Sequence, residues 1–350
     1  MRFTAFFHPL ARIATVTMLA ALTLAGCGST TPARPDAVMQ PALSYSAPPV
    51  RIGIALGGGA AKGFAHIGVI KMLEANGFAP AVVSGTSAGS VVGALYASGM
   101  NAFEMQEKAV ALDEAKIRDL QLSSGGLVLG QKLEDYVNEQ VRRKPLEQMA
   151  KPFVVVATRL EDGERTVFAR GNTGQAVRAS SSVPGVFQPV TIGKYHFVDG
   201  GIVSPVPVDA ARQLGADIVI AVDISNKARG QTPGDMLGTL GQSIAIMGQK
   251  LGQAELARAD VVIRPQVLDI GSADFSQRAN AILEGEKAAL AVMPQIRERV
   301  AQLQAERANA ARAAQQKAAE AQYQTCLEKR SSLQKLAGMA RLDDSCTAPK

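Results

Sequence analysis

The sequence predicts an α/β fold with a mainly parallel central sheet, followed by a helical C-terminal extension. Apolar runs of strand length alternate with longer helical stretches, which is typical of a parallel sheet covered by helices. The runs are apolar almost without interruption, as expected for strands buried on both faces. They occupy residues 51–56, 80–84, 153–157, 217–222 and 260–263. Hydrophobic residues make up 47% and charged residues 19% of the 350 residues, enough for a sizeable core.

The helical stretches have their own signals. Phe64, Ile67, Ile70 and Leu73 recur at a spacing of three, and Asn76-Gly77 is a typical C-terminal stop. A second helix is expected to end near Gly99. Residues 101–150 are mostly helical with no clear strand, so we expect an insertion or cap.

The first residues have the pattern of a bacterial secretory signal. Arg2 and Arg12 precede the apolar run 13–25, which is too short to span a membrane and ends in small residues. Leu24-Ala25-Gly26-Cys27 resembles a lipobox, which predicts a signal peptide over 1–26 and a lipidated Cys27. The alternative is an ordinary signal peptide with an incidental cysteine. An Asp after the lipidated cysteine would favour retention in the inner membrane of enterobacteria. Gly28 occupies that position, so we expect the protein on the periplasmic face of the outer membrane.

Composition divides the remaining chain into three parts. Residues 27–50 are rich in Pro, Ser, Thr and Ala and are predicted to be a disordered tether. The main α/β domain is expected over 51–298, and an Ala-rich helical extension over 299–350. That extension is either solvated or a partner-binding arm. Cys326 and Cys346 are expected to form a disulfide in an oxidising compartment, with two free thiols as the alternative.

Charge and composition exclude several functions. The 37 Lys and Arg against 31 Asp and Glu give a net charge of +6, which falls to +4 without Arg2 and Arg12. Such a mild surplus does not indicate nucleic-acid binding. Three His and three Cys are too few for a His-rich metal site, so no metal is expected. No cofactor is expected either.

Gly85-Thr86-Ser87-Ala88-Gly89 fits the G-x-S-x-G pattern between a predicted strand and a predicted helix. In that setting a sharp turn exposes the Ser oxygen at a helix N-terminus, where partial positive charge favours a developing anion. Ser87 is therefore the candidate nucleophile. The alternative is a hydroxyl that only caps the helix.

Few residues could act as the base that deprotonates Ser87. His8 leaves with the signal peptide, and His66 is more typical of a packing residue. His196 and Asp199, three positions apart on an extended segment, would point to opposite faces. Asp199, followed by Gly200-Gly201, remains as a lone base whose basicity burial would raise. The alternative role for Asp199 is an Asx-type turn.

The segment 57–63, Gly-Gly-Gly-Ala-Ala-Lys-Gly, fits neither a Walker A loop nor the dinucleotide fingerprint. A glycine run before a helix instead presents N–H groups to an oxyanion, with Lys62 adding positive charge.

Together, the blocks 57–63, 85–89 and 199–201 resemble those of the patatin-like phospholipase family, as does the segment 178–187, Arg-Ala-Ser-Ser-Ser-Val-Pro-Gly-Val-Phe. The similarity extends over roughly residues 50–295. The family implies a three-layer α/β/α fold and a calcium-independent Ser–Asp dyad, with Ser87 as nucleophile and Asp199 as base. Asp223, also at the end of an apolar run, lacks the two glycines.

The resemblance also implies the remaining site residues. The oxyanion donors would be the N–H groups of Gly57, Gly58, Gly59 and Ala88. The supporting residues would be Lys62, Gly63, Gly85, Gly89, Gly200 and Gly201.

The expected function is hydrolysis of membrane lipid or lysolipid acyl esters through an acyl-enzyme, by a protein anchored through Cys27. One alternative is thioester hydrolysis or acyl transfer by the same dyad. The other is a non-catalytic lipoprotein that binds a partner through its pocket or its Ala-rich arm. The sequence identifies no protein partner.

Overall fold

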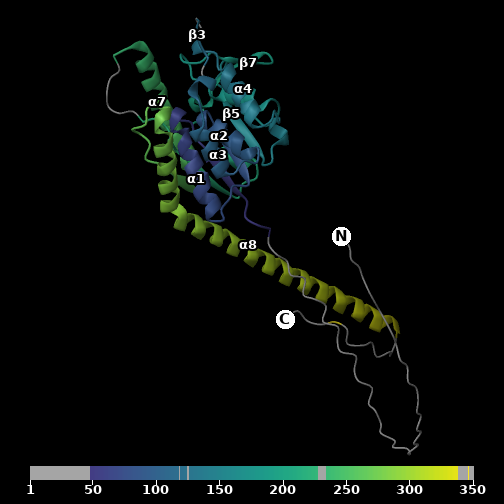
Figure 1. Ribbon diagram of the computed structural model, residues 1–350. Coiled ribbons are helices and arrows are strands. Elements are labelled where there is room, and N and C mark those ends of the chain that lie inside the picture. The colour runs from purple at the N-terminus through teal and green to yellow at the C-terminus, as the bar shows by residue number, and fades with distance from the viewer. Residues whose placement is uncertain (1–47, 118, 124–125, 228–233, 338–345, 347–350) are drawn as a thin grey trace, which may run out of the picture. The chain divides into compact units, whose positions relative to one another are not determined.

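Figure 1 shows a computed structural model that describes residues 48–117, 119–123, 126–227, 234–337 and 346. The predicted signal peptide, the lipidated Cys27 and most of the tether lie outside the described residues. None of the helices in the described ranges combines the length and the apolar character needed to cross a membrane.

One mixed sheet forms the centre of the domain. Its strand order is β10-β9-β1-β2-β5-β8-β7, with β6 paired to β5. The parallel strands are β1 (Ile52–Leu56), β2 (Val82–Thr86), β5 (Phe153–Arg159), β9 (Ile218–Val222) and β10 (Val261–Ile263). The antiparallel strands are β6 (Arg165–Phe168), β7 (Val190–Ile192) and β8 (Tyr195–Asp199). All five predicted strands are present, and the mainly parallel sheet is confirmed.

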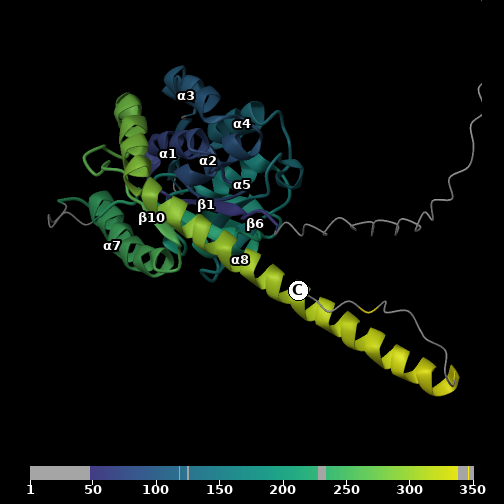
Figure 2. The same ribbon diagram turned by 90° about the horizontal axis from the view of Figure 1, so that it is seen from below.

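Helices surround this sheet (Figures 1 and 2). They are α1 (Phe64–Ala75), α2 (Ala88–Ala97), α3 (Ala102–Val110), α4 (Gln131–Gln140), α5 (Thr173–Ser180), α6 (Val208–Gln213), α7 (Met236–Leu256) and α8 (Arg278–Ala337).

The two faces of the sheet have separate cores, because successive side chains of a strand point to opposite faces. Ile52, Ile54 and Leu56 of β1 belong to the larger core, which includes buried residues of α1, α2, α5 and α8. Ala55 of β1 belongs to a second core with residues of α6 and with Leu256 at the end of α7. The fold is therefore the expected three-layer α/β/α arrangement.

Residues 101–150 differ from the prediction. They contain α3 and α4, as expected, but also an antiparallel pair of strands, β3 (Leu120–Ser123) and β4 (Gly126–Val128). The expectation of no strand in this segment was wrong, because each strand is only three or four residues long and too short for a clear periodicity.

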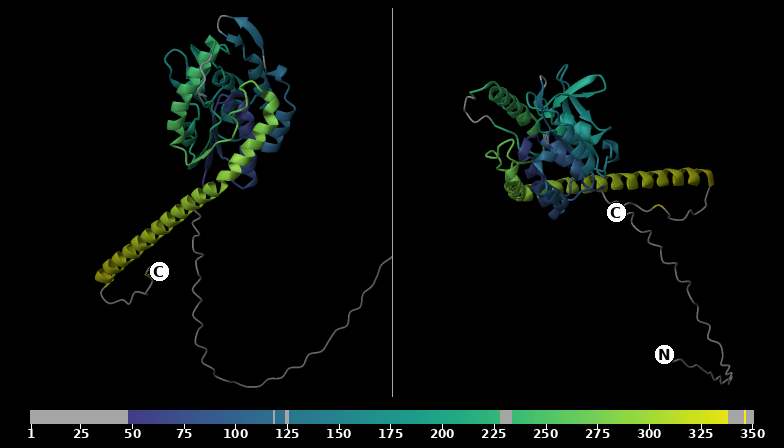
Figure 3. Two further views of the ribbon diagram at one scale, coloured as in Figure 1. Left: turned by 90° about the vertical axis from the view of Figure 1, so that its left-hand side faces the viewer. Right: turned by 45° about the horizontal axis from the view of Figure 1, so that its top comes forward.

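The C-terminal extension is the continuation of a helix that begins inside the domain. Helix α8 runs without a break from Arg278 through position 298, where the sequence suggested a boundary. Its first part includes buried residues such as Ala289 and Ile296, and the Ala-rich part runs on away from the sheet (Figure 3). Cys326 and Cys346 form a disulfide, the pairing expected from the sequence.

The chain enters the domain at the amino ends of the parallel strands. Arg307 of α8 donates hydrogen bonds to the carbonyl oxygens of Pro48 and Pro49 and forms an ion pair with Asp217. Asp217 also accepts a hydrogen bond from the N–H of Arg51. The carboxyl ends of β1 and β2 lie at the other end of these strands, and the sequence motifs follow them there.

Candidate active site

Ser87 lies at the sharp turn between β2 and α2. Its backbone angles, φ 52° and ψ −125°, fall in a region that residues with side chains rarely adopt. Strain of this kind persists only where the surroundings enforce it, and it is frequent at functional sites. The Ser87 hydroxyl makes no capping hydrogen bond to α2. The alternative role as a helix cap is therefore wrong.

The turn requires glycine on both sides of Ser87. A Cβ atom on Gly85 would lie 2.5 Å from the carbonyl oxygen of Gly89, and one on Gly89 would lie 2.1 Å from that of Leu56. Both distances are shorter than atoms can approach, so any side chain would force the strand and the helix apart. The G-x-S-x-G spacing is thus a packing requirement of this bend.

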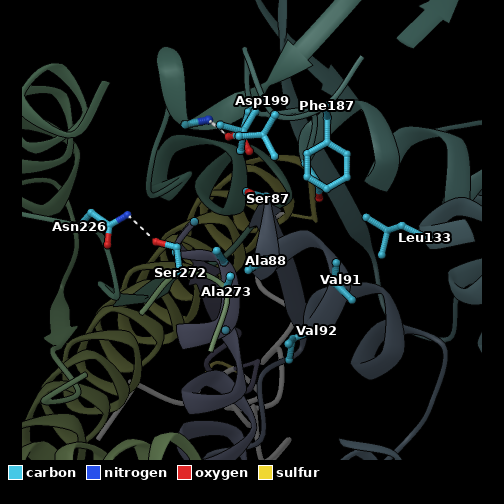
Figure 4. A pocket seen from close by; sticks show the side chains of 18 of the residues that line it. Ser87, Ala88, Val91, Val92, Leu133, Phe187, Asp199, Asn226, Ser272 and Ala273 are labelled. Carbon is cyan, nitrogen blue, oxygen red and sulfur yellow. Dashed lines mark hydrogen bonds between the residues drawn. The ribbon is translucent and has the colours of Figure 1, made fainter. Parts of the chain in front are cut away.

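Asp199 ends β8 and faces the same region as Ser87 (Figure 4). Its Oδ1 accepts a hydrogen bond of 2.7 Å from the N–H of Gly201, which is the Asx-type turn considered from the sequence. Its Oδ2 is buried and has no hydrogen-bond partner. The turn therefore occupies only one of the two oxygens.

The environment makes the Asp199 carboxyl unusually basic. Burial raises its pKa to about 6, and the nearby Ser87 hydroxyl and the Gly201 N–H oppose that shift. The Ser87 hydroxyl is close enough to influence the carboxyl group, yet it does not complete an ordinary hydrogen bond to Oδ2. In unliganded active sites such contacts are often long or poorly aligned.

The segment 178–187 holds both residues in place. The Oγ of Ser180 accepts a hydrogen bond of 2.8 Å from the N–H of Ser87 and donates one of 2.5 Å to the carbonyl oxygen of Val156. Two residues later, the carbonyl oxygen of Ser182 accepts a hydrogen bond from the N–H of Asp199. One short segment thereby fixes the main chain of Ser87 and of Asp199.

Ser87 and Asp199 both line a cavity of about 690 Å³. Its wall is largely apolar, and Figure 4 shows Val91, Val92, Leu133 and Phe187 around the Ser87 side. Part of the wall comes from the segment 101–150, through Met105 and Ala109 of α3 and Leu133 and Tyr136 of α4. A cavity of this size and polarity suits a small apolar ligand or one acyl chain.

Two of the four expected oxyanion donors are already engaged. The N–H of Gly57 donates to the carbonyl oxygen of Val222 at 3.1 Å, and that of Gly58 donates to Pro205 at 3.0 Å. These bonds continue the sheet and anchor the loop, so Gly57 and Gly58 do not offer free donors in this structure. Within the described residues, no hydrogen bond engages the N–H groups of Gly59 and Ala88. Both residues line the cavity.

Lys62 does not line the cavity, contrary to its expected place beside an oxyanion. Its side chain is buried, and its ammonium group donates a hydrogen bond to Oδ1 of Asn226 in the segment after β9. Asn226 in turn donates to Ser272 (Figure 4). Lys62 thus ties the glycine loop to the neighbouring loops. Gly63 packs against α2, since a Cβ there would lie 2.8 Å from that of Ala88.

The rival acid and bases are occupied elsewhere. Asp223 accepts a hydrogen bond from Ser225 and lies 3.6 Å from Arg264. The Nε2 of His66 contacts the carbonyl oxygen of Gly57, and burial lowers its pKa to about 4. His196 is exposed and pairs with Glu161, whereas Asp199 is buried, as the odd spacing predicted.

Glu255 is a buried residue near the site that the sequence did not reveal. Its carboxylate accepts hydrogen bonds from the hydroxyl of Ser204 and the N–H of Val206, and burial raises its pKa to about 7. The Ser204–Val206 segment in turn holds the site, because Ser204 accepts from Thr86 and Pro205 accepts from Gly58. Glu255 is 51 residues from Ser204. No local pattern could have shown this contact.

Comparison with known proteins supports this picture. The family model of the patatin-like phospholipases matches residues 54–212. An uncharacterized NTE family protein of Mycobacterium tuberculosis is 35% identical over 182 residues, which cover 51% of this chain and 51% of that protein. A lysophospholipase, NTE1 of Pyricularia oryzae, is 30% identical over 181 residues, covering 50% of this chain and 12% of that protein.

The chain thus spans about half the length of the mycobacterial relative and a smaller share of the fungal one. Among solved structures, VipD from Legionella pneumophila aligns with a TM-score of 0.49 at 16% identity, covering 71% of this chain and 67% of VipD.

The matched range contains the glycine loop, the strained Ser87, the segment 178–187 and Asp199. Residues 54–212 of this chain form a domain of the patatin-like phospholipase family.

Proposed function

We propose that the protein is a lipid acyl hydrolase in which Ser87 is the nucleophile and Asp199 the base. The observation that carries the proposal is the buried, partnerless Oδ2 of Asp199 beside the strained Ser87 in an apolar cavity. The family of the domain and the lysophospholipase among its relatives support the lipid substrate.

In this mechanism Asp199 Oδ2 takes the proton of the Ser87 hydroxyl while Oγ attacks the acyl carbonyl. The tetrahedral oxyanion is stabilised by the N–H group of Gly59, in the glycine loop before α1, and by that of Ala88, the first residue of α2. Collapse of the intermediate breaks the ester bond, and the proton held by Asp199 passes to the departing alcohol. Water then attacks the acyl-Ser87 ester and loses its proton to Asp199. The bond between the acyl carbon and Oγ breaks, Asp199 returns the proton to Ser87 Oγ, and the fatty acid leaves.

The localisation belongs to the same proposal. Lipidation at Cys27 would hold the enzyme at the bacterial envelope, on the periplasmic face of the outer membrane, where its substrate is abundant. Metabolic labelling with a radioactive fatty acid tests this directly. Label in the wild-type chain that is lost in Cys27→Ser supports the anchor, and equal label in both chains would contradict it.

The catalytic assignment is tested with Ser87→Ala and Asp199→Asn in the full chain, with phospholipid and lysophospholipid as substrates and a calcium chelator present. Each variant should lose at least about 10³-fold in fatty acid release. Ser98→Ala, at the other end of α2, and Asp223→Asn are the matched controls and should retain activity. Only chains with Ser87 should react with a fluorophosphonate. Hydrolysis by Ser87→Ala at the wild-type rate would refute the assignment.

The same measurements separate the alternatives. Faster turnover of an acyl thioester than of either lipid would favour a thioesterase. Product that appears only when an acceptor alcohol is supplied would favour an acyltransferase. A chain that neither turns over any of these substrates nor takes up the fluorophosphonate would leave only a binding function.

A further inference from the structure

Helix α7 has an unusual outer surface. From Met236 to Gln249 it carries no charged residue, although surface helices normally present charges to water. Several of its apolar side chains are nevertheless exposed: 89% for Met236, 50% for Met247, 40% for Leu251 and 39% for Leu240. We call these four residues the α7 outer face.

The four residues form one continuous strip. At about 100° per residue they fall within about 60° of one another around the helix axis. Ile244 lies next to this strip and faces the cavity, together with Gly241, Ala245 and Gly248. One apolar surface therefore runs from the outside of α7 into the wall of the cavity that contains Ser87.

The attachment of α7 is concentrated at its C-terminal end. Glu255 and Leu256 are buried there, and the position of a Cβ on Gly252 lies 3.5 Å from the ring of Pro205. The first part of the helix has no fully buried side chain among those described. Figure 1 shows α7 along one side of the domain. An exposed apolar strip of this kind marks an interaction site.

We propose that the α7 outer face inserts into the interfacial region of a phospholipid membrane and holds the mouth of the cavity against it. This inference rests on the proposed lipid substrate: an acyl chain could then pass from the membrane into the cavity along apolar surface. None of the described helices can span a membrane, so α7 would lie in the plane of the interface, as amphipathic anchors do.

Charge and chain length favour a membrane over a protein partner. Lys250 is exposed next to Leu251 in the sequence and suits an anionic lipid headgroup. The 20 residues 28–47, between Cys27 and the described domain, can extend to roughly 66–72 Å. An anchor at Cys27 would thus leave the domain enough freedom to bring α7 to the same membrane.

The test measures membrane binding separately from hydrolysis. The full chain carrying Cys27→Ser and Ser87→Ala cannot be anchored or turn over lipid, and it is sedimented with vesicles of phosphatidylcholine and phosphatidylglycerol. Adding Leu240→Ser and Met247→Ser should weaken binding at least about tenfold. Leu283→Ser with Leu290→Ser on α8, exposed by 46% and 50%, is the matched control and should leave binding unchanged.

A second readout uses the same α7 substitutions in chains that keep Ser87. Hydrolysis of vesicle lipid should fall about tenfold, whereas turnover of a short water-soluble ester should change less than about twofold. Met236→Ser, at the most exposed position, should show the same pattern without any risk to the fold. Comparable far-ultraviolet circular dichroism would show that all variants are folded.

The outcomes are distinguishable. Vesicle binding that the α7 substitutions leave unchanged overturns the proposal, as does an equal loss from the α8 control. A dimer in sedimentation velocity that dissociates on these substitutions would also overturn it, because the strip would then bind a second copy. If the chain binds vesicles through α7 but Ser87→Ala has no effect on hydrolysis, the membrane proposal stands and the catalytic one fails.

Discussion

The Oγ of Ser180 lies 2.8 Å from the backbone nitrogen of Ser87 and accepts its N–H. Because Ser180 also donates to Val156 on β5, the hydroxyl clamps the strained turn to the sheet. The backbone of Ser87 would otherwise leave a buried N–H without a partner, which is unfavourable in its own right.

Replacing Ser180 with Ala should lower kcat about tenfold with little change in KM, because the turn loses its clamp and not its binding surface. The free energy of unfolding should fall by about 1–3 kcal/mol, the usual effect of an unsatisfied buried group. Steady-state kinetics and urea unfolding measure both quantities. Ser181→Ala is the control for stability, since its buried hydroxyl has no partner. Equal effects of the two substitutions would show that Ser180 has no special role.

The pH dependence of activity should report on Asp199. A base with a pKa of about 6 accepts the Ser87 proton only when it is ionised, so kcat/KM should fall as the pH drops through about 6. An ordinary carboxyl group would give a midpoint near 3.8. A pH profile with a soluble ester decides between the two values.

The same shift predicts an opposite effect on stability. Folded Asp199 holds its proton more tightly than the unfolded chain does, so its contribution to stability decreases as the pH rises from about 4 to above 6. Asn cannot ionise, and its side-chain oxygen can still accept from Gly201. Asp199→Asn should therefore melt at a higher temperature than the wild type at about pH 7.5, and the difference should shrink at about pH 4.5. A variant less stable at both pH values would contradict the buried charge.

Glu255 should act as a positioning residue through the Ser204–Val206 segment. Glu255→Ala leaves the Ser204 hydroxyl and the Val206 N–H without their acceptor, so the segment that holds Gly58 and Thr86 can shift. We expect kcat to fall about tenfold at unchanged KM, and Glu255→Gln to restore most of it, because the amide oxygen can replace one acceptor. Any kinetic inflection from its pKa of about 7 should disappear in Glu255→Gln. Failure of Gln to exceed Ala would remove the positioning role.

His66 provides a test of whether an imidazole takes part. Its Nε2 contacts the Gly57 carbonyl oxygen, and a Gln side chain could donate to the same oxygen. His66→Gln should therefore retain activity within about tenfold, and the acid limb of the pH profile should stay at its wild-type midpoint. A loss comparable to that of Ser87→Ala would mean that the lone-carboxylate mechanism is wrong.

The sequence was most informative where local rules suffice. The strands 52–56 and 218–222 follow from continuous apolar runs. The bend at Ser87 follows from Gly85 and Gly89, because any side chain at these two positions would collide with neighbouring backbone. The antiparallel strands β6 and β7 were not identified, because short strands at a sheet edge carry little pattern. The exposed fraction of the α7 residues also could not be deduced, since an apolar helix is expected to be buried until its neighbours are known.

The details of the site depend on tertiary contacts. Gly57 and Gly58 looked like oxyanion donors because their N–H groups precede a helix, yet distant carbonyl groups of Val222 and Pro205 already bind them. Lys62 was expected to place a positive charge beside the oxyanion, but its ammonium group is buried and donates a hydrogen bond to Asn226. Ser180 stood in a segment noted only for its resemblance, and its bond to Ser87 spans 93 positions in the sequence.

The hydrogen bonds from Arg307 to Pro48 and Pro49 determine at which end of the domain the N-terminal tether would attach. That end is opposite the carboxyl ends of β1 and β2, where Ser87 lies, so a tether stretched from a membrane would hold Ser87 on the far side of the domain. If the proposed anchor at Cys27 forms, the α7 outer face could reach the same membrane only when residues 28–47 are not fully stretched. If both the anchor and the α7 membrane surface hold, the length of residues 28–47 would be a functional parameter in its own right. Shortening that segment would then lower hydrolysis of the anchoring membrane without changing the cavity.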